Sequence, residues 1–394
     1  MPEKLGNGGH GREEYDPNTG KYVADGQPNK RYDNPNEEKD VLGKFFGLKQ
    51  QEMSSNIEPD AYSKIFINRQ ENFLNNDGAI FEYPDYVIIG DKENHIIFKN
   101  LDDLAKYEEK VIKEIAFNDL LRFSNGKKEF PVEFGNGEKF VIRTADDLYY
   151  YIKRFNDEII DASIDKNLLE KFNVSDDDKI AQEDALRNLG MTRDEYIELY
   201  NSMDNVKYKM GKNAKKERKA VITLGLPASG KSITGDSNDI LAGVEIDADI
   251  GKDTIPEYQR NKALVSAVHN ESGALRDVVL ERCLEEGYNL SIPVVGKSVK
   301  SVMKRVKQLR DNGYDIQIAY VDIPFEQNIS RSVTRAVKTG RYTNMSVLLS
   351  SLGNTLTVYN LLKQSPEISG YICFDNRQKP TAIEAKNWKY NTKK

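Results

Sequence analysis

The spacing of apolar residues divides the chain into three regions and a short basic segment. Residues 1–39 are rich in Gly, Asn, Asp, Pro and Lys and contain few aliphatic side chains. A segment of this composition buries too little apolar surface to offset the entropy that is lost on ordering. We therefore expect residues 1–39 to form a disordered tail.

Residues 40–206 combine helical spacing with short strand-like runs, which predicts a small α+β domain of unknown role. The expected helices cover residues 41–48, 100–123 and 144–159. The expected strands cover residues 79–83, 86–89, 95–98, 130–134 and 139–142. The Gly-Asn-Gly sequence at 135–137 is a strong hairpin signal between the last two strands. Asn100, Thr144, Ser175 and Thr192 are the expected N-caps, and Thr192 with Glu195 has capping-box spacing.

Residues 207–219 carry seven Lys or Arg and one Glu, and we expect an exposed basic linker; the alternative is a strip that contacts phosphate. From residue 220 to 394, continuous apolar runs alternate with helical spacing. The expected strands cover residues 220–224, 244–246, 289–295, 316–323 and 371–374. Such alternation predicts an α/β fold, a parallel sheet with helices on both faces, of the P-loop NTPase and kinase type.

Composition narrows the class of protein. The chain of 394 residues has a net charge of −6, which argues against a general binder of nucleic acid or membrane surfaces. It contains no apolar run long enough for a membrane span, and its first 40 residues lack the apolar core of a secretory signal. The two cysteines, Cys283 and Cys373, lie in apolar segments and are expected to be buried and reduced. We expect a cytoplasmic protein, and the few His and Cys make a zinc site improbable.

The clearest motif is Gly-Leu-Pro-Ala-Ser-Gly-Lys-Ser at residues 225–232, which fits the P-loop pattern and follows a predicted strand. Its glycines allow a tight turn with N–H groups directed at phosphate, and its Lys and Ser serve the β/γ-phosphates and Mg²⁺. The expected nucleotide-binding residues are Gly225, Pro227, Ala228, Ser229, Gly230, Lys231, Ser232 and Ile233.

Two aspartates, Asp247 and Asp249, follow the next predicted strand. Ligands of open parallel sheets bind beyond the carboxyl ends of the strands, so both are expected near the P-loop. One carboxylate can accept the proton of a substrate hydroxyl, while the other caps a helix or contacts Mg²⁺ through water. The alternative is that both are turn and N-cap residues.

Arginines form the third candidate group. Arg331 and Arg335 lie one turn apart on a predicted helix over 326–338, and Arg341 follows it. Such arginines can neutralise charge that develops on a transferred phosphoryl group, although a solvated basic helix face has the same pattern.

Taken in order, these motifs resemble the zeta toxin kinases, the P-loop toxins of bacterial toxin–antitoxin systems. The similar segments are the P-loop at 225–232, Ile-Asp-Ala-Asp-Ile-Gly-Lys at 246–252, Ile-Pro-Glu-Tyr at 255–258, Val-His-Asn-Glu-Ser at 268–272 and Gly-Tyr-Asn-Leu at 287–290. The resemblance implies ATP or GTP and Mg²⁺ as cofactors, with Lys231 and Ser232 holding the nucleotide and Mg²⁺. Asp247, from its place after the strand, is the other expected metal ligand. It implies catalytic roles for Lys231, Asp249 (the general base), Arg335 and Arg341.

The family phosphorylates the 3′-hydroxyl of UDP-N-acetylglucosamine and related nucleotide sugars, so the resemblance implies a small-molecule acceptor of this kind. Asp247, Lys252, Glu271 and Lys297 are the expected acceptor-binding residues. One departure concerns the acceptor. Where the family has an acidic residue and Gly-Thr after the third strand, this chain has Pro293 and the sequence Val-Val-Gly-Lys.

Three alternatives stay open at the level of sequence. The chain is a kinase for a nucleotide sugar, a kinase for another acceptor such as a nucleic-acid end, a protein or a dinucleotide, or an NTP-binding module without turnover. A small helical antitoxin blocks the ATP site in the family, so an antitoxin partner or inhibition by residues 40–206 is also expected.

Overall fold

The structure is a computed structural model of the whole chain, and it describes residues 13–16, 21–24, 81–83, 86–90, 95–98, 101–211, 214–237, 243–343, 347–348, 351 and 354–390. It divides into two compact units, Met1–Glu71 and Asn72–Lys394. In the first unit, β1 (Glu13–Asp16) pairs antiparallel with β2 (Lys21–Ala24) and sets Tyr15 opposite Tyr22. These strands lie within the tail predicted to be disordered. Disorder of the other tail residues stays a prediction, and the helix predicted at 41–48 lies outside the described residues.

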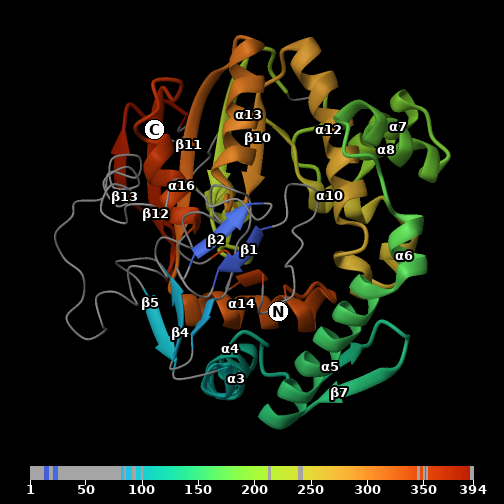
Figure 1. The fold of residues 1–394 in the computed structure, drawn as a ribbon, viewed down its shortest axis with the longest axis vertical. Helices are drawn as coiled ribbons and strands as arrows, with labels where there is room; N and C mark the ends of the chain where they lie inside the picture. The colour runs from blue at the N-terminus through green and yellow to red at the C-terminus, as the bar shows by residue number, and fades with distance from the viewer. Residues whose placement is uncertain are drawn as a thin grey trace. The chain divides into compact units, whose positions relative to one another are not determined.

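A mixed sheet with flanking helices organises the second unit (Figure 1). Among the described residues it has six strands in the order β13-β12-β11-β8-β10-β9. The strands are β8 (Lys219–Leu224), β9 (Val244–Glu245), β10 (Leu290–Val294), β11 (Asp315–Asp322), β12 (Gly370–Asp375) and β13 (Thr381–Lys386). Neighbours from β9 to β12 pair in parallel, and β13 adds an antiparallel edge. The predicted α/β fold with a parallel sheet is confirmed.

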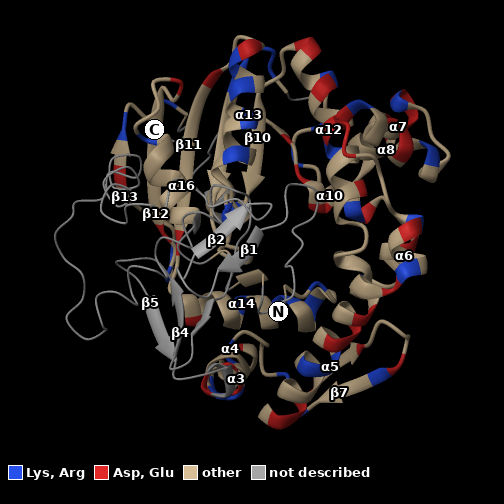
Figure 2. Cartoon of the chain, viewed as in Figure 1, with Lys and Arg blue, Asp and Glu red and all other residues tan. Residues whose placement is uncertain are grey.

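The central strands form because continuous apolar runs satisfy a sheet that is covered on both faces. Val221, Ile222 and Leu224 of β8 are each 0% exposed. Helices α13 (Val299–Asp311) and α16 (Asn354–Leu362) pack against β11, and Figure 2 shows several basic residues along α13. The sequence pattern missed β13 because every residue of this strand is exposed and no apolar alternation marks it.

The remaining helices of this half connect the strands. They are α9 (Lys231–Ser237), α10 (Ala248–Asp253), α11 (Pro256–Arg260), a 3₁₀ turn (Lys262–Val265), α12 (His269–Glu286) and α14 (Phe325–Thr339). Cys283 and Cys373 are free and buried, as predicted, and burial raises the pKa of each thiol to about 12. No helix within the described ranges is long and apolar enough to cross a bilayer.

Before the sheet, the second unit contains short strands and a series of helices. The strands are β3 (Phe81–Tyr83), β4 (Tyr86–Gly90), β5 (His95–Phe98), β6 (Phe130–Glu133) and β7 (Lys139–Ile142). The helices are α3 (Leu101–Lys110), a π-helical segment (Val111–Ala116), α4 (Phe117–Arg122), α5 (Ala145–Ile164), α6 (Lys166–Lys171), α7 (Asp178–Leu189) and α8 (Arg193–Ser202). The predicted β6–β7 hairpin is confirmed.

Of the four predicted helix caps, Asn100 lies outside the described residues and two of the other three are confirmed. Thr144 and Thr192 form complete capping boxes with Asp147 and Glu195. Ser175 is not a cap, because Asp177 accepts hydrogen bonds from the first N–H groups of α7. Ser175 instead supports Asp177, whose backbone N–H donates to the Ser175 hydroxyl at 3.1 Å.

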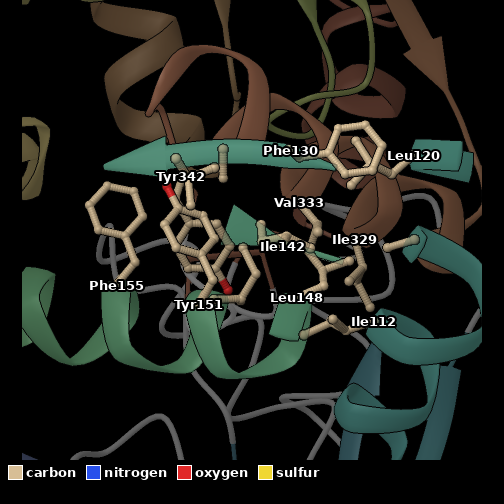
Figure 3. Close-up of a cluster of buried hydrophobic side chains, with 14 of the residues drawn as sticks. Ile112, Leu120, Phe130, Ile142, Leu148, Tyr151, Phe155, Ile329, Val333 and Tyr342 are labelled. Carbon is tan, nitrogen blue, oxygen red and sulfur yellow. The ribbon is translucent and has the colours of Figure 1, made fainter. Parts of the chain in front are cut away.

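Residues 101–164 share one hydrophobic core with α14, the helix that follows β11 (Figure 3). Leu148, Tyr151 and Phe155 of α5 enter this core from one side, and Ile329 and Val333 of α14 enter it from the other. The predicted division into domains at residues 206 and 220 stays a prediction, but this core runs across it.

The buried face of α5 gives a direct test of this core. Leu148 is 0% exposed, so Leu148→Ala should lower the free energy of unfolding by about 2–5 kcal/mol through lost burial and a residual cavity. Ile160 on the same helix is 45% exposed, so Ile160→Ala should cost less than about 0.5 kcal/mol. Urea denaturation of both variants measures the difference, and equal losses would contradict a core at this position.

Candidate phosphate-binding site

The P-loop connects the end of β8 to the start of α9. Its turn requires left-handed backbone at Ala228 (φ 60°) and Gly230 (φ 89°). A Cβ at Gly225 would lie 2.6 Å from the Ser229 hydroxyl, and one at Gly230 would lie 2.4 Å from Asn376 Nδ2. The loop therefore needs glycine at both positions for close packing.

Side chains outside the loop hold its carbonyl groups. Asn376 Nδ2 donates to Ser229 O at 2.8 Å, and Arg331 Nη1 donates to the same oxygen at 3.1 Å. Arg331 Nη2 also donates to Asn376 O at 2.6 Å, and Asn328 Nδ2 donates to Pro227 O. Asn328 and Asn376 were not among the candidates that the sequence offered. Arg331, which was a candidate for charge neutralisation, instead holds the loop from outside. Only the i, i+3, i+7 spacing of Asn328, Arg331 and Arg335 on α14 marks this face in the sequence.

Lys231, the P-loop lysine, folds back on the loop. Its Nζ donates to Gly225 O at 2.7 Å and to Leu226 O at 3.0 Å. Burial lowers the pKa of Lys231 to about 8, although the nearby carboxylates of Asp247 and Asp249 partly oppose this shift. The three residues therefore lie within electrostatic reach of one another, as expected from strand ends at one edge of a parallel sheet.

Asp247 is the N-cap of α10. Its Oδ1 accepts from the backbone N–H of Asp249 at 2.9 Å, so the capping role that was left open is confirmed. Burial, and then the charge of Asp249, raise the pKa of Asp247. Tyr200 of α8 fixes this turn, because its hydroxyl donates to Glu245 O at 2.7 Å and accepts from Asp247 N at 3.4 Å. Nothing in the sequence pattern connected Tyr200 to the site.

Asp249 is the centre of a cluster of cations. Its Oδ2 lies 2.6 Å from Arg341 Nη2 and 3.5 Å from Arg335 Nη2, and its Oδ1 lies 3.2 Å from Lys252 Nζ. Burial by itself would raise the pKa of Asp249, but Lys252, Arg341 and Arg335 outweigh it and hold the pKa below its ordinary value. The structure thus brings together four residues that the sequence analysis selected.

The other selected residues lie in three different settings. Ser232 is exposed in the first turn of α9, and the Ile233 side chain lies outside the described set. Lys297 is exposed after β10. Glu271 is 1% exposed in α12, and its Oε2 has no hydrogen-bond partner among the described residues. Burial raises the pKa of Glu271 to about 7, and its charged neighbours are Glu257 and Lys171, so it does not join the Asp249 cluster.

Pro293, which stands where the resembling family has an acidic residue, lies within β10. It pairs with Thr223 of β8, while on the other side β9 ends at Glu245, opposite Ser291. A proline lacks the N–H that a neighbouring strand would use, and here no β9 partner is required. The position is therefore compatible with proline but provides no carboxylate.

The predicted basic linker makes contacts with its surroundings. Arg218 Nη1 donates to Asn312 O at 2.9 Å, and Lys216 Nζ lies 2.8 Å from Glu286 Oε2. Lys207 Nζ donates to Ser232 O at 3.4 Å, which places one linker cation beside the P-loop helix.

Comparison with known proteins agrees with this geometry. Residues 205–385 match the family model described as Zeta toxin. This part of the chain is a zeta toxin domain. Residues 1–204 lie outside the match, and no curated protein matches the chain significantly.

Two solved structures show a distant likeness to the chain. One is from the PezAT chromosomal toxin–antitoxin system of Streptococcus pneumoniae, with 17% identity, a TM-score of 0.37, and coverage of 56% of this chain and 86% of that chain. The other is AvrRxo1-ORF1:-ORF2 with ATP, with 15% identity, a TM-score of 0.35, and coverage of 61% and 71% respectively.

The lowered pKa of Lys231 predicts that the free energy of unfolding of the zeta toxin domain depends on pH through this group. Between pH 8 and pH 10.5 the unfolded lysine binds more protons than the folded one, so wild-type stability gains from rising pH through this group. Lys231→Met lacks this titration. The free energy of unfolding of wild type minus that of Lys231→Met should therefore increase between about pH 7 and about pH 10. A difference that is constant with pH, measured by urea denaturation, would refute the shift.

Proposed function

We propose that the zeta toxin domain transfers the γ-phosphate of ATP or GTP to a hydroxyl group of a small molecule, with a nucleotide sugar such as UDP-N-acetylglucosamine as the first candidate acceptor. The observation that carries this proposal is the partly buried carboxylate of Asp249 among Arg335, Arg341 and Lys252, within electrostatic reach of the P-loop lysine. A carboxylate, several cations and a phosphate-binding loop are the groups that phosphoryl transfer requires.

Arg335 and Arg341 have one role before the γ-phosphate is transferred and another during the transfer. Arg335 and Arg341 bind Asp249 in the structure described here, and the buried Nε of Arg341 has no acceptor among the described residues. This donor supports the fit of a phosphate oxygen beside Arg341. Phosphate oxygens would compete with Asp249 for both guanidinium groups and would then neutralise charge on the transferred group.

Release from the arginines would make Asp249 a better base. When Arg335 and Arg341 bind phosphate instead of Asp249, the carboxylate loses their charges but stays partly desolvated. The pKa of Asp249 would therefore rise from its depressed value. The carboxylate then accepts the proton of the acceptor hydroxyl. The hydroxyl oxygen forms a bond to the γ-phosphorus, the bond from that phosphorus to the bridging oxygen breaks, and the nucleoside diphosphate leaves.

Mg²⁺ fits the oxygen atoms at this site. Asp247 and Asp249 place two carboxylates close enough that the charge of one raises the pKa of the other, and a divalent cation would relieve that repulsion. Within the described ranges no three His, Cys, Asp or Glu side chains converge as a complete metal site. Mg²⁺ commonly binds one or two protein oxygens together with nucleotide phosphates, so Ser232 and Asp247 are its proposed ligands. When bound, Mg²⁺ would offset negative charge on the phosphates.

Pro293 favours a second candidate, a kinase of the same chemistry with a different acceptor. A site without the acidic side chain cannot accept hydrogen bonds from sugar hydroxyls at that point. Burial lowers the pKa of His269 to about 4, and the nearby charges of Lys252 and Lys297 add to this shift. These cations favour an acceptor that carries negative charge, which includes a nucleotide sugar, a dinucleotide and a nucleic-acid end.

Isotope transfer from labelled ATP or GTP tests both candidates. Asp249→Asn removes the proposed base and keeps the size of the side chain, so transfer should fall by about 10²–10⁴-fold. The assay uses panels of nucleotide sugars, dinucleotides, oligonucleotides and cell protein, and metabolite profiling after induction identifies the acceptor in cells. Nucleotide binding measured by calorimetry should persist in this variant.

The control is Asp311→Asn at the end of α13, which should transfer like the wild type. Asp311 lies just before the amino end of β11, whereas the P-loop follows the carboxyl end of the parallel strand β8. Unchanged transfer by Asp249→Asn would remove Asp249 as the base. Wild-type protein that binds Mg²⁺ nucleotide but labels no acceptor would instead favour a binding module without turnover.

A further inference from the structure

Helix α14 presents different side chains on two faces. One face carries Asn328, Arg331 and Arg335, which hold the P-loop or contact Asp249. Another face carries Ile329 and Val333, each 1% exposed, together with Phe325 and Ala336 at 8% and 1%. Because both faces belong to one rigid helix, whatever holds the apolar face also sets the position of the arginines.

The apolar face of α14 is covered largely by residues that lie before the zeta toxin match, together with a few inside it such as Ala263 and Leu348. The core that contains it takes buried side chains from the π-helical segment, α4, the β6–β7 hairpin and α5, all within residues 101–164 (Figure 3). Two polar contacts lie beside this core. Tyr107 donates to Glu326 Oε1 at 2.9 Å, and Ser330 of α14 donates to Asp119 Oδ2 at 2.7 Å.

The same core holds the segment that carries Arg341. Tyr342, the next residue, is 5% exposed, and its ring centroid lies 6.2 Å from that of Phe155 in α5. Neighbouring backbone positions move together, so the packing of Tyr342 against α5 restricts where the Arg341 guanidinium can reach. Both arginines of the Asp249 cluster thus depend on residues 101–164 through buried contacts.

We propose that residues 101–164 are a positioning module for Arg335 and Arg341, and that the phosphate site of the zeta toxin domain is incomplete without them. This inference rests on the proposed function, because it assigns the two arginines to the terminal phosphate of a nucleotide. A positioning role and inhibition by residues 40–206 predict opposite effects on nucleotide binding. An inhibitory cover would weaken nucleotide binding while it is attached, whereas a positioning module strengthens the contacts that the arginines make.

The expected signature is selectivity for triphosphate over diphosphate. Arg335 and Arg341 are assigned to the γ-phosphate, whereas the P-loop also binds a diphosphate. Loosening the α5 contact should therefore weaken binding of a non-hydrolysable triphosphate more than binding of the diphosphate. General destabilisation of a folded protein would leave this ratio unchanged.

The experiment compares two aromatic substitutions on α5 in the full chain. Phe155→Leu removes the ring that packs on Tyr342, whereas Tyr150→Leu changes a residue that is 51% exposed on the same helix. Calorimetry measures the dissociation constants of the triphosphate analogue and the diphosphate, and circular dichroism confirms folding. The ratio of interest is the Kd of the diphosphate divided by the Kd of the triphosphate analogue. Phe155→Leu should reduce this ratio by at least about threefold, and Tyr150→Leu should retain the wild-type value.

A double-mutant cycle separates positioning from other effects. In an Arg341→Gln background, Phe155→Leu should change the ratio less than it does alone, because the arginine it positions is gone. Ser330→Ala, which loses the bond to Asp119, serves as a second variant if Phe155→Leu does not fold.

The outcomes are distinguishable. If Arg341→Gln reduces the ratio and folded Phe155→Leu and Ser330→Ala do not, the positioning role is wrong and the proposed function stands. If the wild type binds no nucleotide, or Arg341→Gln leaves its selectivity unchanged, the arginine assignment in the proposed function fails first.

Discussion

The pairing of the partly buried Asp249 carboxylate with three cations organises the candidate site. Burial penalises its charge, and Lys252, Arg335 and Arg341 compensate for that penalty. The three cations come from α10, from α14 and from the segment after α14. The position of the carboxylate therefore links the second strand of the sheet to a helix that follows the fourth.

That link makes α14 the element on which the geometry depends. Asn328 and Arg331 hold P-loop carbonyls, and Arg335 contacts Asp249 from the same face. With α14 in place, the loop, the proposed base and the arginines form one connected set of hydrogen bonds and ion pairs, in which movement of the helix alters every member.

The support for α14 lies largely before the zeta toxin match, which begins at residue 205. Helix α8, which ends just before the match, also contacts elements inside it. Tyr200 bonds to the turn after β9, and Arg193 of the same helix lies 2.7 Å from Glu281 in α12. The match marks where the phosphate motifs lie, and the residues before it supply packing for the helices that carry those motifs.

The sequence by itself determined what depends on local order. The P-loop, the β8 and β11 runs and the capping boxes at Thr144 and Thr192 follow from spacing over a few residues. The resemblance to the zeta toxin kinases added the choice of Asp249, Arg335 and Arg341 among the candidate carboxylates and arginines. Tertiary structure decided the rest. The bond from Tyr200 to Glu245 O, the bond from Asn376 to Ser229 O and the contact of Phe155 with Tyr342 join positions far apart in the chain. No periodicity records such pairs, because they exist only when the sheet and α14 place separate segments side by side.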